Sequence, residues 1–174
     1  MTWTHETLLA FLSSNQISIQ AHQHTAVLTM EDSANLGLDL PGTRCKNLLV
    51  QNKKGSKRYL VTTPPDAAVD LSQLGKLLES GRLSLSPSAD MMELLGVAPG
   101  AMSPFALAAD QEQQQVQLIM DEALATSPYF QFHPLINTMT VAIDQENFKR
   151  FLSLINHTPQ YLPIPRRLAA PIAE

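Results

Sequence analysis

The stretch Pro41–Val50, PGTRCKNLLV, joins a turn to a buried strand, and its polar residues stand where the two meet. Pro41-Gly42 is typical of a turn, and Leu48-Leu49-Val50 of an apolar strand. Lys46 and Asn47 precede that strand directly. Lysine is rarely buried without a partner, and asparagine favours turns and caps. The pair is therefore either an incidental feature of a strand end or the edge of a binding pocket.

The chain has 174 residues, of which 44% are hydrophobic and 16% charged, as expected for one globular domain. We assign residues 1–158 to a single domain and 159–174 to a proline-rich C-terminal tail that lies extended on the surface. Cys45 is the only cysteine, which excludes an internal disulfide and fits the reducing cytoplasm. No run is long enough for a membrane helix, and the first residues lack the features of a signal peptide.

Periodicity and capping signals predict short strands interleaved with helices, and hence a mixed α/β (α+β) domain. Thr29 and Asp32 have the spacing of a capping box. Asp70 and Asp144 can each cap a helix, and Gly81 and Gly96 can each end one. The predicted helices are 4–15, 30–36, 71–79, 87–95 and 145–155, and the predicted strands are 17–22, 46–51, 58–63, 82–85, 115–120 and 138–143.

The positive charge of the chain is concentrated in one predicted hairpin. Arg44, Lys46 and the hairpin residues Lys53, Lys54, Lys57 and Arg58 are six of the twelve basic residues, with no acidic residue between Arg44 and Arg58. The rest of the chain carries six basic and sixteen acidic residues, within a formal net charge of −4. Such asymmetry indicates either a local phosphate-binding face or a solvent-exposed, lysine-rich hairpin tip.

Three stretches could carry chemistry: Lys46-Asn47, the loop Gly100–Pro104 and the segment Phe132–Thr138. A glycine and a proline fix the backbone of the loop, which can then direct N–H groups at a ligand. His133 stands where one predicted strand ends, and Asn137 where another begins. Each stretch also has a purely structural interpretation: a lysine reaching solvent, ordinary turn residues, and a histidine hydrogen-bonded in the core.

Several other chemistries find no support in the sequence. There is no recognisable catalytic triad, phosphate-binding glycine loop or dinucleotide fingerprint. His22 and His24 could share a strand face, but no third metal ligand stands nearby, so we expect neither a metal nor a cofactor. Nothing identifies a base that would activate Cys45 as a nucleophile.

Taken together and in this order, the motifs PG-x-x-x-KNL, GRLS, LLGV-x-PG-x-x-SPFAL and FHPL-x-NT-x-T resemble the trans-editing prolyl-tRNA deacylases. These are free-standing relatives of the editing domain inserted in bacterial prolyl-tRNA synthetase, also called the YbaK/ProX group. The chain looks most similar to the alanyl-tRNA(Pro) deacylases, because Lys46-Asn47 occurs together with His133-Pro134-Leu135. Two pairs depart from the family pattern: Arg44-Cys45 and Ala108-Ala109.

The resemblance implies a mixed, barrel-like β-sheet surrounded by helices and a cytoplasmic hydrolase that clears mischarged tRNA(Pro). The implied partners are the acceptor end of that tRNA and, as a further candidate, prolyl-tRNA synthetase, but neither a membrane nor DNA; we expect a monomer or a weak dimer. The alternatives are the same chemistry on cysteinyl-, seryl- or threonyl-tRNA, and a non-catalytic protein that binds tRNA or a synthetase.

The resemblance also implies roles for individual residues. The ester is already activated, so hydrolysis requires a positioned water, a stabilised oxyanion and selection by size, but no covalent nucleophile. Lys46 would hold the acyl carbonyl or a terminal phosphate, Asn47 would orient the ester or the water, and His133 would line the pocket or pass a proton. The expected substrate-binding residues are Gly100, Ala101, Met102, Ser103, Pro104, Arg82, Phe132, Leu135 and Asn137. The expected RNA-binding residues are Lys53, Lys54, Lys57 and Arg58.

Overall fold

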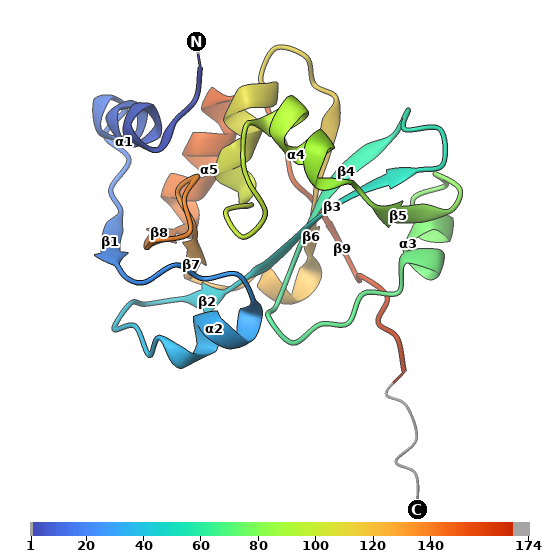
Figure 1. Ribbon diagram of the computed structural model, residues 1–174, viewed down its shortest axis with the longest axis horizontal. Coiled ribbons are helices and arrows are strands. Elements are labelled where there is room, and N and C mark those ends of the chain that lie inside the picture. Colours follow the sequence, from blue (N-terminus) through green and yellow to red (C-terminus); the bar gives the residue numbers. More distant parts are fainter. Residues whose placement is uncertain (1, 169–174) are drawn as a thin grey trace, which may run out of the picture.

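The computed structural model describes residues 2–168, which fold into two β-sheets and the helices that cover them (Figure 1). The helices of this part are α1 His5–Ser14, α2 Met30–Asn35, α3 Leu71–Leu77, α4 Ser88–Leu95 and α5 Gln145–Leu154, with the 3₁₀ helices η1 Pro104–Asp110 and η2 Glu122–Leu124. The strands are β1 Gln20–Gln23, β2 Thr43–Arg44, β3 Lys46–Asn52, β4 Arg58–Thr63, β5 Leu83–Leu85, β6 Val116–Asp121, β7 Tyr129–Phe132, β8 Met139–Asp144 and β9 Gln160–Leu162.

Both sheets mix parallel and antiparallel pairs. One sheet has the strand order β1-β8-β7-β2, and the other has the order β5-β3-β4-β6-β9. The parallel pairs are β2 with β7, β4 with β6, and β6 with β9. The predicted mixed α/β class is confirmed, although the strands divide between two sheets instead of rolling into one.

The chain passes from one sheet to the other at Cys45. β2 ends at Arg44 in the first sheet, and β3 begins at Lys46 in the second. Gly42 permits the close approach of β2 to β7, because it has φ +102° and a Cβ there would lie 2.6 Å from the carbonyl oxygen of Tyr129. The turn at Pro41-Gly42 and the strand that follows therefore join the two sheets.

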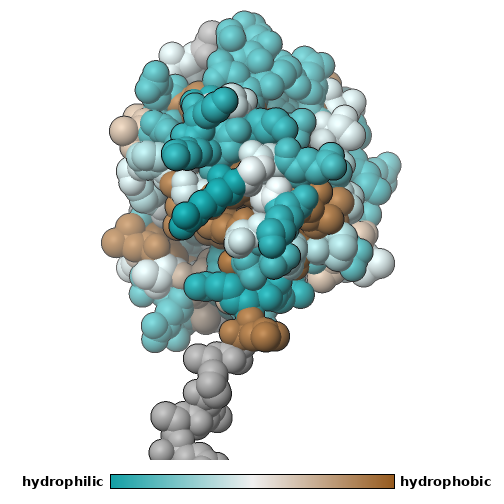
Figure 2. All heavy atoms as spheres, turned by 90° about the vertical axis from the view of Figure 1, so that its right-hand side faces the viewer, coloured by the Kyte–Doolittle hydropathy of each residue, from teal (hydrophilic) through white to brown (hydrophobic). Residues whose placement is uncertain are grey.

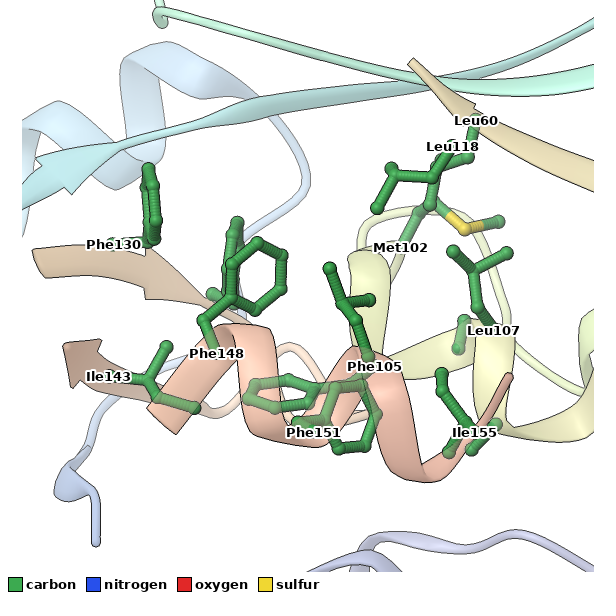
Figure 3. Packing of buried hydrophobic residues seen from close by; sticks show 14 of the residues in the cluster. Leu60, Met102, Phe105, Leu107, Leu118, Phe130, Ile143, Phe148, Phe151 and Ile155 are labelled. Carbon is green, nitrogen blue, oxygen red and sulfur yellow. The ribbon is translucent and has the colours of Figure 1, made fainter. Parts of the chain in front are cut away.

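The main core lies between the two sheets and is rich in phenylalanine (Figure 3). Phe105 from η1 and Phe151 from α5 have ring centroids 5.1 Å apart, and Phe130 from β7 lies 5.2 Å from Phe148 of α5. Phe132, which directly precedes His133, packs on this group and is 2% exposed. The aromatic cluster therefore fixes the strand end that delivers His133.

The capping signals in the sequence located most helix ends correctly. The Thr29–Asp32 capping box is formed, and the carboxylates of Asp70 and Asp144 accept from backbone N–H groups at the starts of α3 and α5. Gly96 ends α4 in the left-handed conformation, with φ +68°. The predicted start of the helix 87–95 was off by one residue, because Pro87 stands at the N-cap and Ser88 begins α4.

The predicted boundary between domain and tail at residue 158 does not match the packing. Residues 160–162 form β9, which pairs in parallel with β6, and Ile164 is buried. Arg166 donates to the carboxylate of Asp121 over 2.9 Å, so the segment is held by side chains as well. The prolines of this segment, Pro159, Pro163 and Pro165, lie outside β9 and so remove no donor from its pairing with β6. The last residues of the predicted tail, 169–174, lie outside the described part.

Among the residues described, no helix combines the length and the apolar character needed to cross a lipid bilayer.

Asp110 joins the end of η1 to the chain that follows and to the C-terminal part of the domain. Its carboxylate accepts from the backbone N–H groups of Gln115 and Val116, both at 2.9 Å, and from His157 Nε2 at 3.1 Å. His157 Nδ1 lies 2.9 Å from the carbonyl oxygen of Ile155. Both ring nitrogens of His157 thus face oxygen acceptors.

We predict that Asp110→Ala lowers the free energy of unfolding by about 3–5 kcal/mol, because it leaves a buried histidine and two backbone donors without their acceptor. Urea denaturation measures the change. The control is Glu112→Ala, an exposed acidic residue on the same turn, for which the change stays within about 0.5 kcal/mol. Equal losses in the two variants would contradict this account of Asp110.

Candidate active site

A cavity of about 320 Å³ opens where the two sheets meet. The end of β2 and the start of β3 contribute to it, together with the ends of β7 and β8 and the loop before η1. Its walls are formed by Val27, Leu28, Thr29, Met30, Ser33, Arg44, Cys45, Lys46, Asn47, Leu48, Met91, Pro99, Gly100, Met102, Gln131, Phe132, His133 and Thr140. The three stretches singled out in the sequence thus meet around one hollow.

Asn47 is held by its neighbour across the β3–β4 ladder. It pairs with Thr62, whose hydroxyl donates to Asn47 Oδ1 over 2.8 Å. Thr62 is fully buried. Because the amide oxygen is engaged in this way, the Nδ2 donor of Asn47 is directed elsewhere, and it is the part of the side chain suited to meet a ligand carbonyl.

Lys46 approaches the cavity from the other face of β3. Side chains alternate along a strand, so Lys46 shares a face with Leu48, whereas Asn47 shares one with Leu49. The ammonium of Lys46 donates to the carbonyl oxygen of Ala67 in the loop after β4. Burial lowers the pKa of Lys46, Arg167 lowers it further, and Asp66 acts in the opposite direction. Lys46 is therefore a fixed cation at the rim, beside the cationic Arg167.

His133 is held from two sides. The Ser103 hydroxyl donates to its carbonyl oxygen over 2.7 Å, and its Nδ1 lies 2.9 Å from the carbonyl oxygen of Met139. A carbonyl oxygen can only accept, so Nδ1 carries the proton and Nε2 is the acceptor of the neutral ring. Burial lowers the pKa of His133; the Met139 hydrogen bond raises it, and His24 lowers it.

The loop that starts at Gly100 packs against two other segments. Gly100 has φ +89°, and a Cβ there would lie 3.0 Å from the carbonyl oxygen of Val27. Asn137 donates from Nδ2 to that same oxygen over 3.0 Å. Ala101 donates its N–H to Ala98 and does not line the cavity, which leaves Gly100 and Met102 as the loop residues that do.

The remaining predicted substrate-binding residues divide by position. Met102 and Phe132 form apolar parts of the wall. Ser103 and Asn137 support the wall through the hydrogen bonds described, and Pro104 is buried at the start of η1. Leu135, with φ +68°, packs against the main core instead of lining the cavity.

Thr140 lines the cavity, although the sequence motifs predict no role for it. Its hydroxyl lies 2.8 Å from His24 Nε2. The sequence offered His24 only as an incomplete metal pair with His22, and no spacing rule connects residue 24 with residue 140. Pairing of β1 with β8 creates the contact, since His22 lies opposite Thr140 and His24 follows two residues later.

The two departures from the family pattern lie in different places. Arg44 and Cys45 belong to the cavity wall, and Arg44 also donates to the carbonyl oxygen of Met30 over 3.2 Å. Burial raises the pKa of the Cys45 thiol to about 12, so it stays protonated and is a poor nucleophile. Ala108 is buried and Ala109 exposed on η1, and neither lines the cavity.

The basic hairpin lies at the opposite end of β3 from the cavity. Lys53 and Lys54 are exposed at its tip, and Lys57 donates to the carbonyl oxygen of Glu79 over 3.2 Å. The pairing of Asn52 with Leu83 brings the exposed Arg82 to this end as well, outside the cavity wall. Six residues of strand separate Lys46 from Asn52, roughly 20 Å. The side of the molecule with the hairpin tip and α3 is largely hydrophilic (Figure 2).

Comparison with known proteins places this arrangement in a family. Residues 24–151, which include all the cavity-wall residues named above, match the family described as the aminoacyl-tRNA editing domain. The chain belongs to the aminoacyl-tRNA editing domain family. Members of this family act as editing deacylases on aminoacyl-tRNA.

Similar editing-domain proteins occur in animals and bacteria. The prolyl-tRNA synthetase associated domain-containing protein 1 of Xenopus laevis is 33% identical over 156 residues, covering 87% of this chain and 92% of that protein. The prolyl-tRNA editing protein ProX of Acetoanaerobium sticklandii is 26% identical over 153 residues, covering 88% and 93%.

Solved structures agree on the editing-domain fold. A candidate trans-editing enzyme for prolyl tRNA synthetase gives a TM-score of 0.62 at 18% identity, covering 93% of this chain and 98% of that one. The hypothetical protein APE2540 gives a TM-score of 0.65 at 17% identity, covering 84% and 93%. These two likenesses show the fold alone.

We predict that His133 makes the stability of this editing domain pH-dependent. Burial lowers its folded-state pKa below the ordinary value of 6.5, so the unfolded chain binds this proton more readily. The neutral ring therefore makes its full contribution to the free energy of unfolding above pH 6.5, the ordinary pKa of histidine. That contribution is lost as the pH falls from 6.5 through the lower pKa of the folded state.

The measurement is the free energy of unfolding of wild type and His133→Gln between about pH 7.5 and about pH 5. The loss on acidification is smaller in His133→Gln, whereas His22→Gln, an exposed histidine on β1, keeps the wild-type loss. Parallel pH curves for wild type and His133→Gln would show that the ring titrates alike in both states.

Proposed function

We propose that this editing domain hydrolyses the ester of mischarged tRNA(Pro) in trans, with alanyl-tRNA(Pro) as the preferred substrate. The observation that carries the proposal is the division of polarity across the cavity. The β3 side presents the Asn47 amide as a donor, while the Lys46 ammonium is held at Ala67 on the other face of the strand. The other sheet presents His133 Nε2 as an acceptor. An ester under attack by water needs both kinds of group.

The donors are suited to the two negative parts of the substrate. Asn47 Nδ2 donates to the ester carbonyl and to the oxyanion that develops on it, and its position is fixed in advance by Thr62. Lys46 stands at the rim with Arg167 nearby, which favours a terminal phosphate over the carbonyl as its partner. Lysine binds phosphate as a point charge, without requiring the flat geometry of a guanidinium.

The acceptor is suited to the attacking water. His133 Nε2 accepts a hydrogen bond from that water and orients it toward the carbonyl carbon, because the lowered pKa keeps the ring neutral near pH 7. The adjacent ribose hydroxyl assists in activating the water. The proton of the water passes to the departing ribose oxygen, so the products are the free amino acid and the tRNA. The protonated thiol of Cys45 takes no part.

The size of the cavity supports a small aminoacyl group. A volume of about 320 Å³ is at the low end for ligand sites, which run from about 300 to about 1,000 Å³. Met102 and Phe132 are held in the core and cannot easily retreat, since they are 6% and 2% exposed. Steric exclusion of the larger, cyclic proline discriminates more strongly than a missing methylene in a hydrophobic site.

The decisive experiment incubates the purified protein with a panel of aminoacyl-tRNAs and follows loss of the labelled amino acid. We expect alanyl-tRNA(Pro) to be cleaved and prolyl-tRNA(Pro) to survive. Faster cleavage of cysteinyl-, seryl- or threonyl-tRNA would overturn the assigned specificity. Binding of tRNA without cleavage of any substrate would show a non-catalytic member of the family.

Lys46→Ala tests the rim cation. We expect kcat/KM for alanyl-tRNA(Pro) to fall about 10- to 100-fold, mainly through KM, because the variant cannot make the charge-assisted hydrogen bond to phosphate. Lys149→Ala, which removes an exposed lysine of α5, is the control and leaves kcat/KM unchanged. A loss confined to kcat would instead assign Lys46 to the carbonyl.

The exposed hairpin lysines are proposed to contact phosphates of the acceptor stem. Lys53→Gln/Lys54→Gln should weaken tRNA binding and reduce the slope of log affinity against log salt by about 1 for each phosphate that the variant no longer neutralises. Lys149→Gln/Arg150→Gln removes the same charge from α5 and keeps the wild-type slope. Filter binding at several salt concentrations measures both, and identical slopes would remove the hairpin from the interface.

A further inference from the structure

Thr140 and His24 form a second polar feature of the cavity, and the direction of their hydrogen bond can be assigned. His24 Nδ1 lies 2.7 Å from the carbonyl oxygen of Thr25, so Nδ1 must donate. In the neutral ring Nε2 is then an acceptor. The Thr140 hydroxyl, 2.8 Å away, therefore donates its only hydrogen to His24. Its oxygen keeps lone pairs that can accept from a molecule in the cavity.

The surroundings of His24 keep this arrangement in place. The backbone N–H of His24 donates to Thr138 over 2.9 Å, and the ring lies 6.0 Å from that of His133 at 57°. His133 is thus a titratable neighbour of His24. Within residues 2–168, no carboxylate lies within 4.0 Å of the ring nitrogens of His24.

The sheet that carries Thr140 thus presents two uncharged acceptors, Thr140 Oγ1 and His133 Nε2, opposite the donors of β3. An aminoacyl ester has one group that requires acceptors, its α-ammonium. Its carbonyl oxygen, in contrast, requires donors. A cavity with acceptors on one side and Asn47 on the other accommodates both.

We propose that Thr140 binds the α-ammonium of the aminoacyl group and that His24 is the positioning residue that orients the Thr140 hydroxyl for it. The proposal rests on the proposed function, since it takes the ligand to be an aminoacyl-adenosine end. It gives the site a further selectivity: a free amino group is required, so N-acylated aminoacyl-tRNA and peptidyl-tRNA are poor ligands.

The test compares two non-hydrolysable ligands by calorimetry: the amide analogue of alanyl-adenosine and its propionyl counterpart, which lacks only the amino group. Wild type binds the alanyl analogue about tenfold or more tightly, as expected for a hydrogen bond to a charged group. Thr140→Val and His24→Leu reduce that ratio toward one. Equal binding of the two analogues by wild type, or binding of neither, would overturn the proposal.

Conservative variants separate positioning from a structural role. His24→Gln places an amide oxygen where it can accept from Thr140, and Thr140→Ser keeps the hydroxyl, so both retain most of the ratio. His22→Gln is the matched control on the same strand. NMR of the imidazole nitrogens should show His24 Nε2 as the unprotonated acceptor in wild type and a changed Nε2 signal in Thr140→Val. A ratio retained in Thr140→Val would also refute the proposal.

The binding test does not depend on turnover. If wild type prefers the alanyl analogue but cleaves no aminoacyl-tRNA, the deacylase function fails and the ammonium site stands. If it cleaves alanyl-tRNA and N-acetyl-alanyl-tRNA equally well, the ammonium site fails and the deacylase function stands.

Discussion

The site depends on the passage of one extended segment between two sheets at Cys45. Because β2 pairs with β7 and β3 pairs with β4, Arg44 to Asn47 are fixed by both sheets at once. These four residues all line the cavity. Gly42 is the local requirement for this arrangement, since any side chain there would collide with Tyr129. The buried thiol of Cys45 fills the junction and adds no reactivity.

One sheet supplies hydrogen-bond donors and the other supplies acceptors, because different neighbouring groups hold the polar side chains on each sheet. On the β3 side, Thr62 occupies the amide oxygen of Asn47, and Ala67 holds the ammonium of Lys46. On the other side, backbone carbonyl oxygens occupy the Nδ1 atoms of His133 and His24, so His133 Nε2 is left as an acceptor for a ligand and His24 Nε2 faces the Thr140 hydroxyl. Donors and acceptors are therefore segregated by hydrogen bonds that exist before a ligand arrives, which lowers the cost of organising the site.

Local signals predicted the elements well and the site only partly. Helix starts were predicted correctly at Thr29, Asp70 and Asp144, because a capping side chain bonds to backbone N–H groups only a few residues away. Lys46-Asn47, Gly100 and His133 could be identified as polar or special residues beside strands. Three features depend on strand pairing between distant segments, which no local pattern specifies. They are the position of the cavity where these residues meet, the contact between His24 and Thr140, and the pairing of β9 with β6. Adjacency in the sequence was also a poor guide to shared position, because Lys46 and Asn47 lie on opposite faces of β3.

The C-terminal segment supports the loop that holds the Lys46 ammonium on the other face of β3. Ile164 is buried beneath α3 and the second sheet, and Arg167 donates its backbone N–H to Ala68 over 2.8 Å. The preceding residue of that loop, Ala67, accepts from the Lys46 ammonium. The segment therefore stabilises the loop that positions Lys46, although it lies beyond residues 24–151. The family match therefore includes Lys46 and its partner Ala67, whereas the C-terminal segment that supports their loop lies outside the match.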